Sequence, residues 1–435
     1  MYKKMFNLLA ALICLTLLVT GCTAGQSTSK ETSTGASNLK SIDLMANVQA
    51  IPWSGTPDIA DQNLLSGISR FSAQLLLESV KNEGNIMISP ASVFLALAMT
   101  VNGADTETRD AMLQVLAGQD ITIDQINQLS RDWMALLEKS ESKTQMSLAN
   151  SIWFRDGFVP YQPFLQSNAD YYKAGARNLD FSDPGAPAII NGWVKEATHD
   201  LIDKLIEKIE PSTVMFLINT LYFKADWMTP FIKNDTWKQK FATPAGSVEV
   251  DFMHRTDHMR YFADLDAKGV ALPYDNEQFV YFAILPDDDV DPHTWLAQQE
   301  AASLFDRLGT MVAQDAQTAV ALALPRYEVK YDDSLVNELT TLGMGIAFNG
   351  GLADFSRLNE ARSKGLYISE VKHKTAIRVD EKGTEAAAAT VVVIDKSAKA
   401  YDEELVFDRP FLYGIMDMET KLPLFVGILE DPTGK

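Results

Sequence analysis

An alternating run of small, uncharged side chains near the carboxyl end of the chain constrains the fold more than any other feature. Every second side chain from Thr384 to Ile394 is small or apolar, as the buried face of a strand requires. The acidic residues Glu385 and Asp395 fall on the opposite parity and would face solvent in a sheet. Local propensity favours a helix or an ordered linker instead, because four alanines follow a glutamate. The run alone therefore leaves both structures open.

Length and composition are those of a globular protein. The chain has 435 residues, of which 46% are hydrophobic and 22% charged, enough for one large core or two domains. It carries 38 Lys and Arg against 58 Asp and Glu, a formal net charge of -20. This charge argues against nucleic acid as a partner, because phosphates would be repelled.

The amino terminus has the pattern of a lipoprotein signal. Lys3 and Lys4 precede an apolar run from Leu8 to Val19 that is too short for a comfortable membrane span. The run ends in Val-Thr-Gly before Cys22, which resembles a bacterial lipobox. We therefore expect an exported protein, held on the outside of a bacterial cell envelope by lipid on Cys22. The alternative is an ordinary secretory signal with a chance cysteine.

The sequence suggests three segments: a signal peptide over 1–21, a lipidated cysteine and tether over 22–57, and a single domain over 58–435. The stretch that follows Cys22 is rich in Ser, Thr and Gly, which is typical of a flexible tether. The other cysteine, Cys14, lies within the signal, so the mature protein would have no disulfide and no catalytic thiol.

The pattern of the predicted domain favours an α+β fold with a large sheet. Apolar residues at helical spacing predict helices over 63–81 and 90–102, the second capped by Ser89. Later runs are apolar, β-branched or aromatic, and they predict strands over 147–154, 213–224, 279–285, 319–324, 374–379 and 423–429.

Common catalytic motifs are absent from the sequence. No nucleophile elbow, zinc-binding His-Glu-x-x-His helix, phosphate-binding loop or Cys-x-x-Cys pair occurs. His254 and His258 could share a helix face and bind a metal, but their segment lacks helical periodicity, so we expect a polar loop there and no metal site. His373 is expected to make a buried hydrogen bond in a strand. We expect neither an enzyme nor a cofactor.

Five short motifs follow one another in a defined order along the chain. They are Asn85-Ile86-Met87-Ile88-Ser89-Pro90-Ala91-Ser92, Asn219 to Trp227, Val371-Lys372-His373-Lys374, Phe407-Asp408-Arg409-Pro410-Phe411-Leu412, and Pro423-Leu424-Phe425-Val426-Gly427. In this order they resemble the motifs of the serpins, serine protease inhibitors that act as suicide substrates. The resemblance covers nearly everything from about Asp61 to the end.

The resemblance implies a large central mixed sheet with surrounding helices and an exposed reactive-centre loop. It implies a monomer that forms a covalent complex with a target serine protease, whose cleavage of the loop lets the loop enter the sheet. The hinge of that loop would comprise Glu381, Gly383, Thr384, Glu385, Ala386, Ala387, Ala388 and Ala389, with Thr384 the first side chain to enter.

Other roles carried over by position concern the sheet itself. A polar cluster beneath its centre, where strands part, would contain Ser89, Ser92, Asn219 and His373, and Trp227 would lie where insertion begins. Relatives often have Gly and Lys two and three residues after the threonine that corresponds to Thr198. Here Asp200 and Leu201 occupy these places.

The reactive bond expected from the usual spacing is Ser397-Ala398, which suits elastase-like or subtilisin-like proteases with shallow or apolar pockets. Lys396-Ser397 or a bond after Lys399 would suit a trypsin-like protease. A non-inhibitory serpin-fold binding protein is the main alternative, although its hinge would usually contain bulky, charged or proline residues. A lipid-anchored solute-binding protein and a hydrolase explain the ordered motifs less well.

Overall fold

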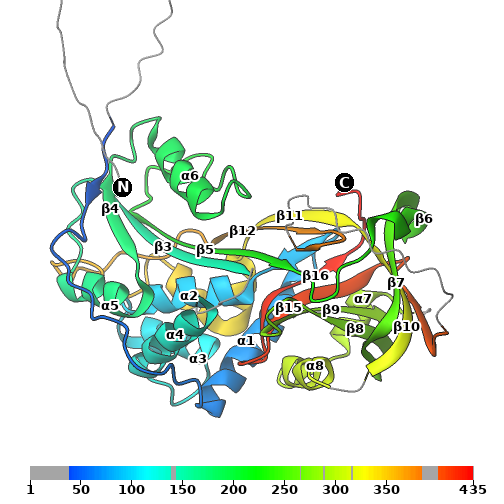
Figure 1. The fold of residues 1–435 in the computed structure, drawn as a ribbon. Coiled ribbons are helices and arrows are strands. Elements are labelled where there is room, and N and C mark those ends of the chain that lie inside the picture. The colour runs from blue at the N-terminus through cyan, green and yellow to red at the C-terminus, as the bar shows by residue number, and fades with distance from the viewer. Residues whose placement is uncertain are drawn as a thin grey trace, which may run out of the picture. The chain divides into compact units, whose positions relative to one another are not determined.

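The computed structural model describes residues 39–138, 144–264, 266–287, 290–314, 317–384 and 400–434. Several predicted sites lie outside these ranges, namely Cys22, the hinge residues Glu385 to Ala389, and the reactive-bond candidates Lys396, Ser397, Ala398 and Lys399. The described residues form an α+β unit with two large sheets, shown in Figure 1.

A seven-stranded sheet, here called the large sheet, contains the segments that the sequence singled out. In spatial order its strands are β1 (Ile42–Asp43), β4 (Gly175–Leu179), β3 (Gln145–Arg155), β5 (Met215–Asp226), β13 (Gly383–Thr384), β12 (Lys372–Val379) and β11 (Tyr327–Ser334). β3 pairs in parallel with β4, and the other pairs are antiparallel. In the described residues β5 and β12 do not pair with each other, and only β13 lies between them.

A second, nine-stranded sheet holds most of the strongly apolar strands. Its order is β14 (Glu403–Val406), β10 (Gln317–Pro325), β7 (Gly246–Asp264), β8 (Ala267–Pro273), β9 (Phe279–Pro286), β15 (Phe411–Asp417), β16 (Leu422–Leu429) and β2 (Ile86–Ile88), with β6 (Thr236–Thr243) paired to β7. β9, β15 and β16 are buried along their whole length, so they form the centre of the hydrophobic core.

Helices cover both faces of the large sheet (Figure 1). In chain order the helices of the described residues are α1 (Gln62–Ser79), α2 (Pro90–Val101), α3 (Thr106–Leu116), α4 (Ile123–Glu138), α5 (Gln162–Tyr172), α6 (Ala186–Ala197), α7 (Pro292–Ala297), α8 (Leu304–Val312) and α9 (Val336–Leu339). A 3-10 turn at Lys233–Asp235 lies between α6 and α7, and short π and 3-10 turns, Thr340–Met344 and Gly345–Phe348, follow α9. α7 and α8 pack against strands of the nine-stranded sheet. α2 contacts β5 on one face, whereas α6 packs on β3 and β5 from the other. None of the described helices is both long and apolar enough to span a bilayer.

The predicted elements are confirmed, but the sequence reasoning was incomplete. α1, α2 and the six predicted strands are present, and the Ser89 side chain caps α2 by accepting a hydrogen bond from the Ser92 amide at 3.2 Å. Helices α3 to α9 were not predicted. The expected polar loop around His254 and His258 is wrong, because both residues lie in β7, whose pairing with β8 and β10 supplies backbone hydrogen bonds that local pattern does not reveal.

The compact unit begins at Leu39 rather than at Asp58, where the sequence placed the domain boundary. β1 pairs with β4 at the edge of the large sheet. Further along, the indole of Trp53 donates to the Asp170 carbonyl at 2.6 Å, and the Ile51 amide donates to the Asp170 carboxylate at 2.8 Å. These partners are distant in sequence, so a Ser- and Thr-rich composition nearby gave no sign of them.

The turn after α6 is strained at the site where the sequence departs from relatives. His199 has φ 47° and Asp200 has φ 68°, both in the left-handed region that glycine tolerates best. Two consecutive residues with side chains there cost roughly 1 to 2 kcal/mol each, somewhat less for Asp. The Asp200 side chain offsets little of this conformational cost, because its ion pair with Lys195 is exposed and measures 3.5 Å.

We predict that Asp200→Gly raises the free energy of unfolding by about 0.5 to 1 kcal/mol, because it relieves the left-handed strain. The urea midpoint would measure it. Asp203→Gly is the matched control, since Asp203 pairs with the same Lys195 at 2.9 Å but has no positive φ. That control should lower the midpoint. An equal loss in both variants would contradict the strain argument.

Candidate functional site

The strand β13 occupies one end of the space between β5 and β12. Gly383 is opposite Asp226, and Thr384 lies between Ala225 of β5 and Val379 of β12. Gly383 has no room for a side chain, because an added Cβ would lie 1.9 Å from the carbonyl oxygen of Ala225. Two hinge residues predicted from the sequence are therefore already part of the sheet, and the first of them has to be glycine.

The turn that leads into β13 is held by backbone and indole donors from the end of β5. The Trp227 amide donates to the carbonyl of Lys382 at 2.6 Å, and its indole Nε1 donates to the carbonyl of Asp380 at 2.8 Å. The Phe231 amide donates to the carbonyl of Glu381 at 2.8 Å. Three consecutive carbonyls are thus satisfied by one segment, which fixes the path of the chain before the hinge.

The side chain of Thr384 enters the core at this end of the sheet. It is 2% exposed, and its Oγ1 lies 2.5 Å from the hydroxyl of Tyr274. The Tyr274 ring stacks on Trp227 with centroids 4.8 Å apart and planes at 8°. Burial keeps the pKa of Tyr274 well above its ordinary value of 10.0, so the hydroxyl is neutral. Tyr274 was not identified from the sequence.

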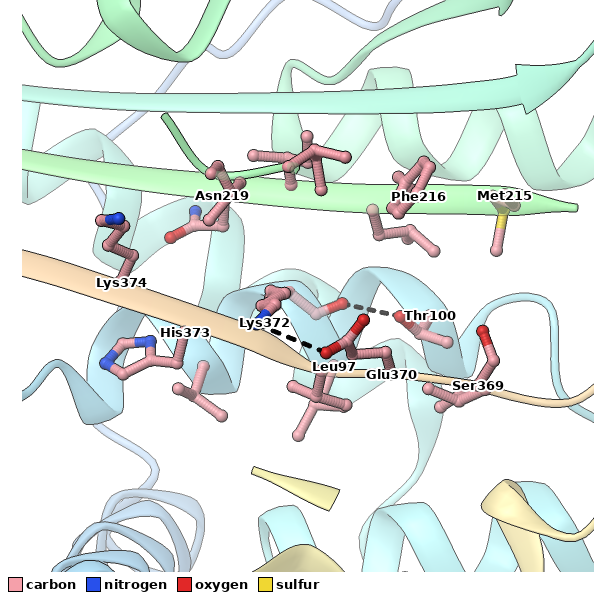
Figure 2. A pocket seen from close by; sticks show the side chains of 18 of the residues that line it. Leu97, Thr100, Met215, Phe216, Asn219, Ser369, Glu370, Lys372, His373 and Lys374 are labelled. Carbon is pink, nitrogen blue, oxygen red and sulfur yellow. Dashed lines mark hydrogen bonds and ion pairs between the residues drawn. The ribbon is translucent and has the colours of Figure 1, made fainter. Parts of the chain in front are cut away.

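Beyond β13, the separation of β5 and β12 leaves a gap that we call the slot. It lies between the segment 215–221 of β5 and the segment 365–376 that ends in β12, with α2 beneath, and contains a cavity of about 280 Å³. Figure 2 shows Met215, Phe216 and Asn219 along one edge and Lys372, His373 and Lys374 along the other. The two edges offer backbone groups to any strand that enters between them.

The four residues of the predicted polar cluster are connected by hydrogen bonds at the floor of the slot. The Ser89 amide donates to Nε2 of His373 at 3.0 Å, and the Ser89 hydroxyl donates to the Leu424 carbonyl at 2.7 Å. Because Nε2 accepts, the neutral ring carries its proton on Nδ1. Burial lowers the pKa of His373 from 6.5 to about 4. His373 is therefore a neutral structural acceptor, as the sequence suggested.

Asn219 links the slot to a second set of buried amides. Its Nδ2 donates to Oδ1 of Asn150 at 2.7 Å, and Nδ2 of Asn150 donates to the Tyr172 carbonyl at 2.7 Å. The hydroxyl of Ser92 reaches the backbone carbonyl of Asn219 at 3.5 Å. Within the described residues, the buried Oδ1 of Asn219 has no hydrogen-bond partner. The orphan acceptor lies on the slot side of β5 (Figure 2), and Asn150 is a cluster member that the sequence reasoning missed.

His254, one of the two histidines considered for metal binding, is held by contacts within its own sheet and with the turn before β6. Nδ1 of His254 contacts the Asp235 carbonyl at 3.1 Å, and Nε2 contacts Nε2 of Gln239 at 2.9 Å. Its ring stacks on Trp237, with centroids 3.5 Å apart. Both ring nitrogens are thus occupied.

Comparison with known proteins identifies the family of this chain. The model of the family described as "Serpin (serine protease inhibitor)" matches residues 66–432. The chain belongs to the serpin family. An uncharacterised serpin-like protein of Thermococcus kodakarensis is 29% identical to this serpin over 425 residues, covering 96% of this chain and 97% of the relative. The leukocyte elastase inhibitor of Bos taurus is 30% identical over 383 residues, covering 85% of this chain and 100% of that protein.

Solved serpin structures share the fold. The thermophilic serpin tengpin in its native state matches with a TM-score of 0.82 and 36% identity, covering 90% of this chain and 100% of that chain. Serpins bind target proteases, and the family consists generally of serine protease inhibitors, although some members are non-inhibitory. The α+β class and the serpin resemblance predicted from the sequence are thereby confirmed.

We predict that this serpin loses stability as pH falls below about 6.5, because the folded state holds His373 neutral with a pKa of about 4 while the unfolded chain binds a proton at its ordinary pKa. This group alone should cost about 2 kcal/mol at pH 5 relative to pH 7.5. Urea midpoints at both pH values would measure it, and His373→Gln should show a smaller acid-induced loss.

His293 provides the control of opposite sign. A short contact with Glu430 raises its pKa, so its stabilisation is present at low pH and lost as pH rises. His293→Gln should therefore lose more stability on acidification than the wild type. The assignment of the acid effect to His373 is wrong if His373→Gln and the wild type lose stability equally.

Proposed function

We propose that this chain inhibits serine proteases as a suicide substrate, with the segment that follows β13 serving as both substrate and inserting strand. The observation that carries the proposal is the position of Gly383 and Thr384, which already pair between β5 and β12 at the end of the slot. A strand that continues from Thr384 would be directed along the slot. The alternation of small side chains from Thr384 to Ile394 suits that path.

The proposed reaction starts as ordinary proteolysis. The protease serine oxygen attacks the carbonyl of the reactive bond, an ester forms, and the peptide bond breaks with its nitrogen taking up a proton. The new carboxyl-terminal end of the loop remains esterified to the protease. Insertion then competes with hydrolysis of the ester by water, and an inserted loop carries the attached protease with it.

Insertion is favourable because a strand in the slot would pair with the edges of β5 and β12, which do not pair with each other in the described part of the chain. Ladder hydrogen bonds each contribute about 0.5 to 1.5 kcal/mol net. Burial of Val392 and Ile394 would add roughly 1.5 to 3 kcal/mol each. The orphan Oδ1 of Asn219 beside the slot adds an acceptor that an entering chain could satisfy. The uncleaved state would therefore be kinetically trapped rather than the lowest in free energy.

We propose an elastase-like or subtilisin-like target, cleaved at Ser397-Ala398. Two features support this: the small residues of that bond, and the name leukocyte elastase inhibitor borne by relatives from Bos taurus and Homo sapiens. Lys396-Ser397 or a bond after Lys399 would instead suit a trypsin-like protease. A non-inhibitory binding role is less consistent with a glycine and a buried threonine at the start of the hinge.

The proposed location is the outer face of a bacterial cell envelope, with lipid on Cys22 as the anchor. Its support is the Val-Thr-Gly-Cys sequence at the end of the apolar run. We predict that Cys22→Ser moves the protein from the membrane fraction to the soluble fraction, and that labelled palmitate is incorporated only into the wild type. Equal labelling of both proteins would exclude Cys22 as the lipidated residue.

The central prediction is that Thr384→Arg converts the inhibitor into a substrate. The side chain at 384 is buried, and an unpaired buried charge costs several kcal/mol, so insertion should fail while cleavage continues. A panel of serine proteases would be incubated with each protein and analysed on denaturing gels. The wild type should give detergent-resistant adducts, and the variant should give cleaved protein only.

Glu385→Arg is the matched control, because alternation puts residue 385 on the opposite parity, where a charge should be tolerated. Adducts should persist in that variant. The mass of the released carboxyl-terminal peptide locates the reactive bond, since cleavage at Ser397-Ala398 gives a peptide that begins at Ala398. The proposed function is wrong if no protease in the panel forms an adduct with the wild type, or if Thr384→Arg forms adducts normally.

A further inference from the structure

The contact between Tyr274 and Thr384 has a feature that the backbone pairing of β13 does not explain. Tyr274 follows β8 and is fully buried, yet its hydroxyl lies 2.5 Å from Oγ1 of Thr384. Within the described residues, this is the hydrogen bond that the Thr384 side chain makes. The donors on Trp227 and Phe231 hold the carbonyls of residues 380–382, which precede β13. The Tyr274 hydroxyl is thus the group that contacts the side chain at 384.

The Tyr274 hydroxyl is held in place from several sides. Its ring stacks on Trp227 at 4.8 Å and meets the ring of Phe223 at 5.0 Å with planes at 66°. Its amide donates to the Phe279 carbonyl at 3.1 Å, and the residue forms an isolated bridge with Trp227. A ring restrained in this way presents its hydroxyl at one fixed point.

A fixed hydroxyl at this point can specify register. Strand side chains alternate between faces, so a shift of one residue would bring Glu385, in place of Thr384, toward the buried phenol. That phenol is neutral because burial raises its pKa. A buried carboxylate with one neutral partner is poorly stabilised, whereas a threonine hydroxyl is satisfied.

We propose that Tyr274 is a positioning residue that holds Thr384 in the first place of the slot and so sets the register in which the loop inserts. The proposal rests on the proposed inhibitory function and adds a residue outside the loop that governs its efficiency. The hydrogen bond acts before the protease arrives. After cleavage, insertion starts from a chain that is already in register, which favours insertion over ester hydrolysis.

The first experiment measures the hinge without any protease. Amide hydrogen exchange of the segment 376–384 would be followed by mass spectrometry in the full-length wild type and in Tyr274→Phe. Loss of one net hydrogen bond should speed exchange there by about three- to ten-fold. Tyr281→Phe is the matched control, because Tyr281 is equally buried and contacts Trp227, but its hydroxyl pairs with that of Tyr327 at 3.1 Å.

The second experiment measures the partition of the acyl-enzyme. The number of inhibitor molecules consumed per protease inhibited should rise by roughly two- to ten-fold in Tyr274→Phe, since more loops are hydrolysed before insertion. The rate of loop cleavage should stay within about two-fold of the wild type, because the acylation step does not involve Tyr274. Thr384→Val removes the same hydrogen bond from the other side, and the double variant should be no worse than either single one.

The outcomes separate this inference from the proposed function. Unchanged exchange at 376–384 in both Tyr274→Phe and Thr384→Val would overturn the positioning role, whatever proteases do. Faster exchange with an unchanged partition would also overturn it, because the contact would then be merely structural. If the wild type forms no adduct with any protease, the inhibitory function is wrong, and the exchange data alone decide whether Tyr274 fixes the register of β13.

Discussion

The separation of β5 and β12 is the constraint on which the rest of this structure depends. The two strands pair outward, with β3 and β11, and within the described residues only the short strand β13 lies between them and pairs with both. Sheet edges with unpaired backbone groups are costly when they are shielded from water, because each unsatisfied group forfeits a hydrogen bond. α2 closes the slot from below and α6 lies over the opposite face of the sheet. The fold thus maintains a place for one more strand.

The polar cluster under the slot is compatible with the sheet both before and after a strand enters the slot, because residues below the sheet hold it in place. Ser89 is fixed by the start of α2 and by the Leu424 carbonyl, and it presents its amide to His373. Asn219 is supported by Asn150 through its amide nitrogen, which leaves the amide oxygen available. The network connects β5 to β12 through Ser89 and Ser92 at the start of α2, below the slot and not across it, so that insertion need not break it.

Much of the fold could be predicted from the sequence, because several of its helices and strands have clear local patterns of apolar residues. α1 and α2 have regular apolar faces, and the buried strands read as continuous apolar runs. Helices α3 to α9, the β7 strand around His254 and the segment near Trp53 were missed, since their stabilising partners are remote in sequence. The same reason hid Tyr274 and Asn150. Each acts through side-chain hydrogen bonds to residues distant in sequence, and neither belongs to a motif whose spacing predicts those contacts.

The sequence by itself determined the family, the class of fold, and the alternating chemistry of the segment that begins at Thr384, because these depend on residue type and order. It also placed glycine at 383, where a Cβ would collide with Ala225. The tertiary structure decided whether that segment begins as a helix or as a strand. Residues 383 and 384 are a strand because β5 and β12 offer backbone partners on both sides and Tyr274 offers a hydroxyl, and these contacts come from residues distant in sequence.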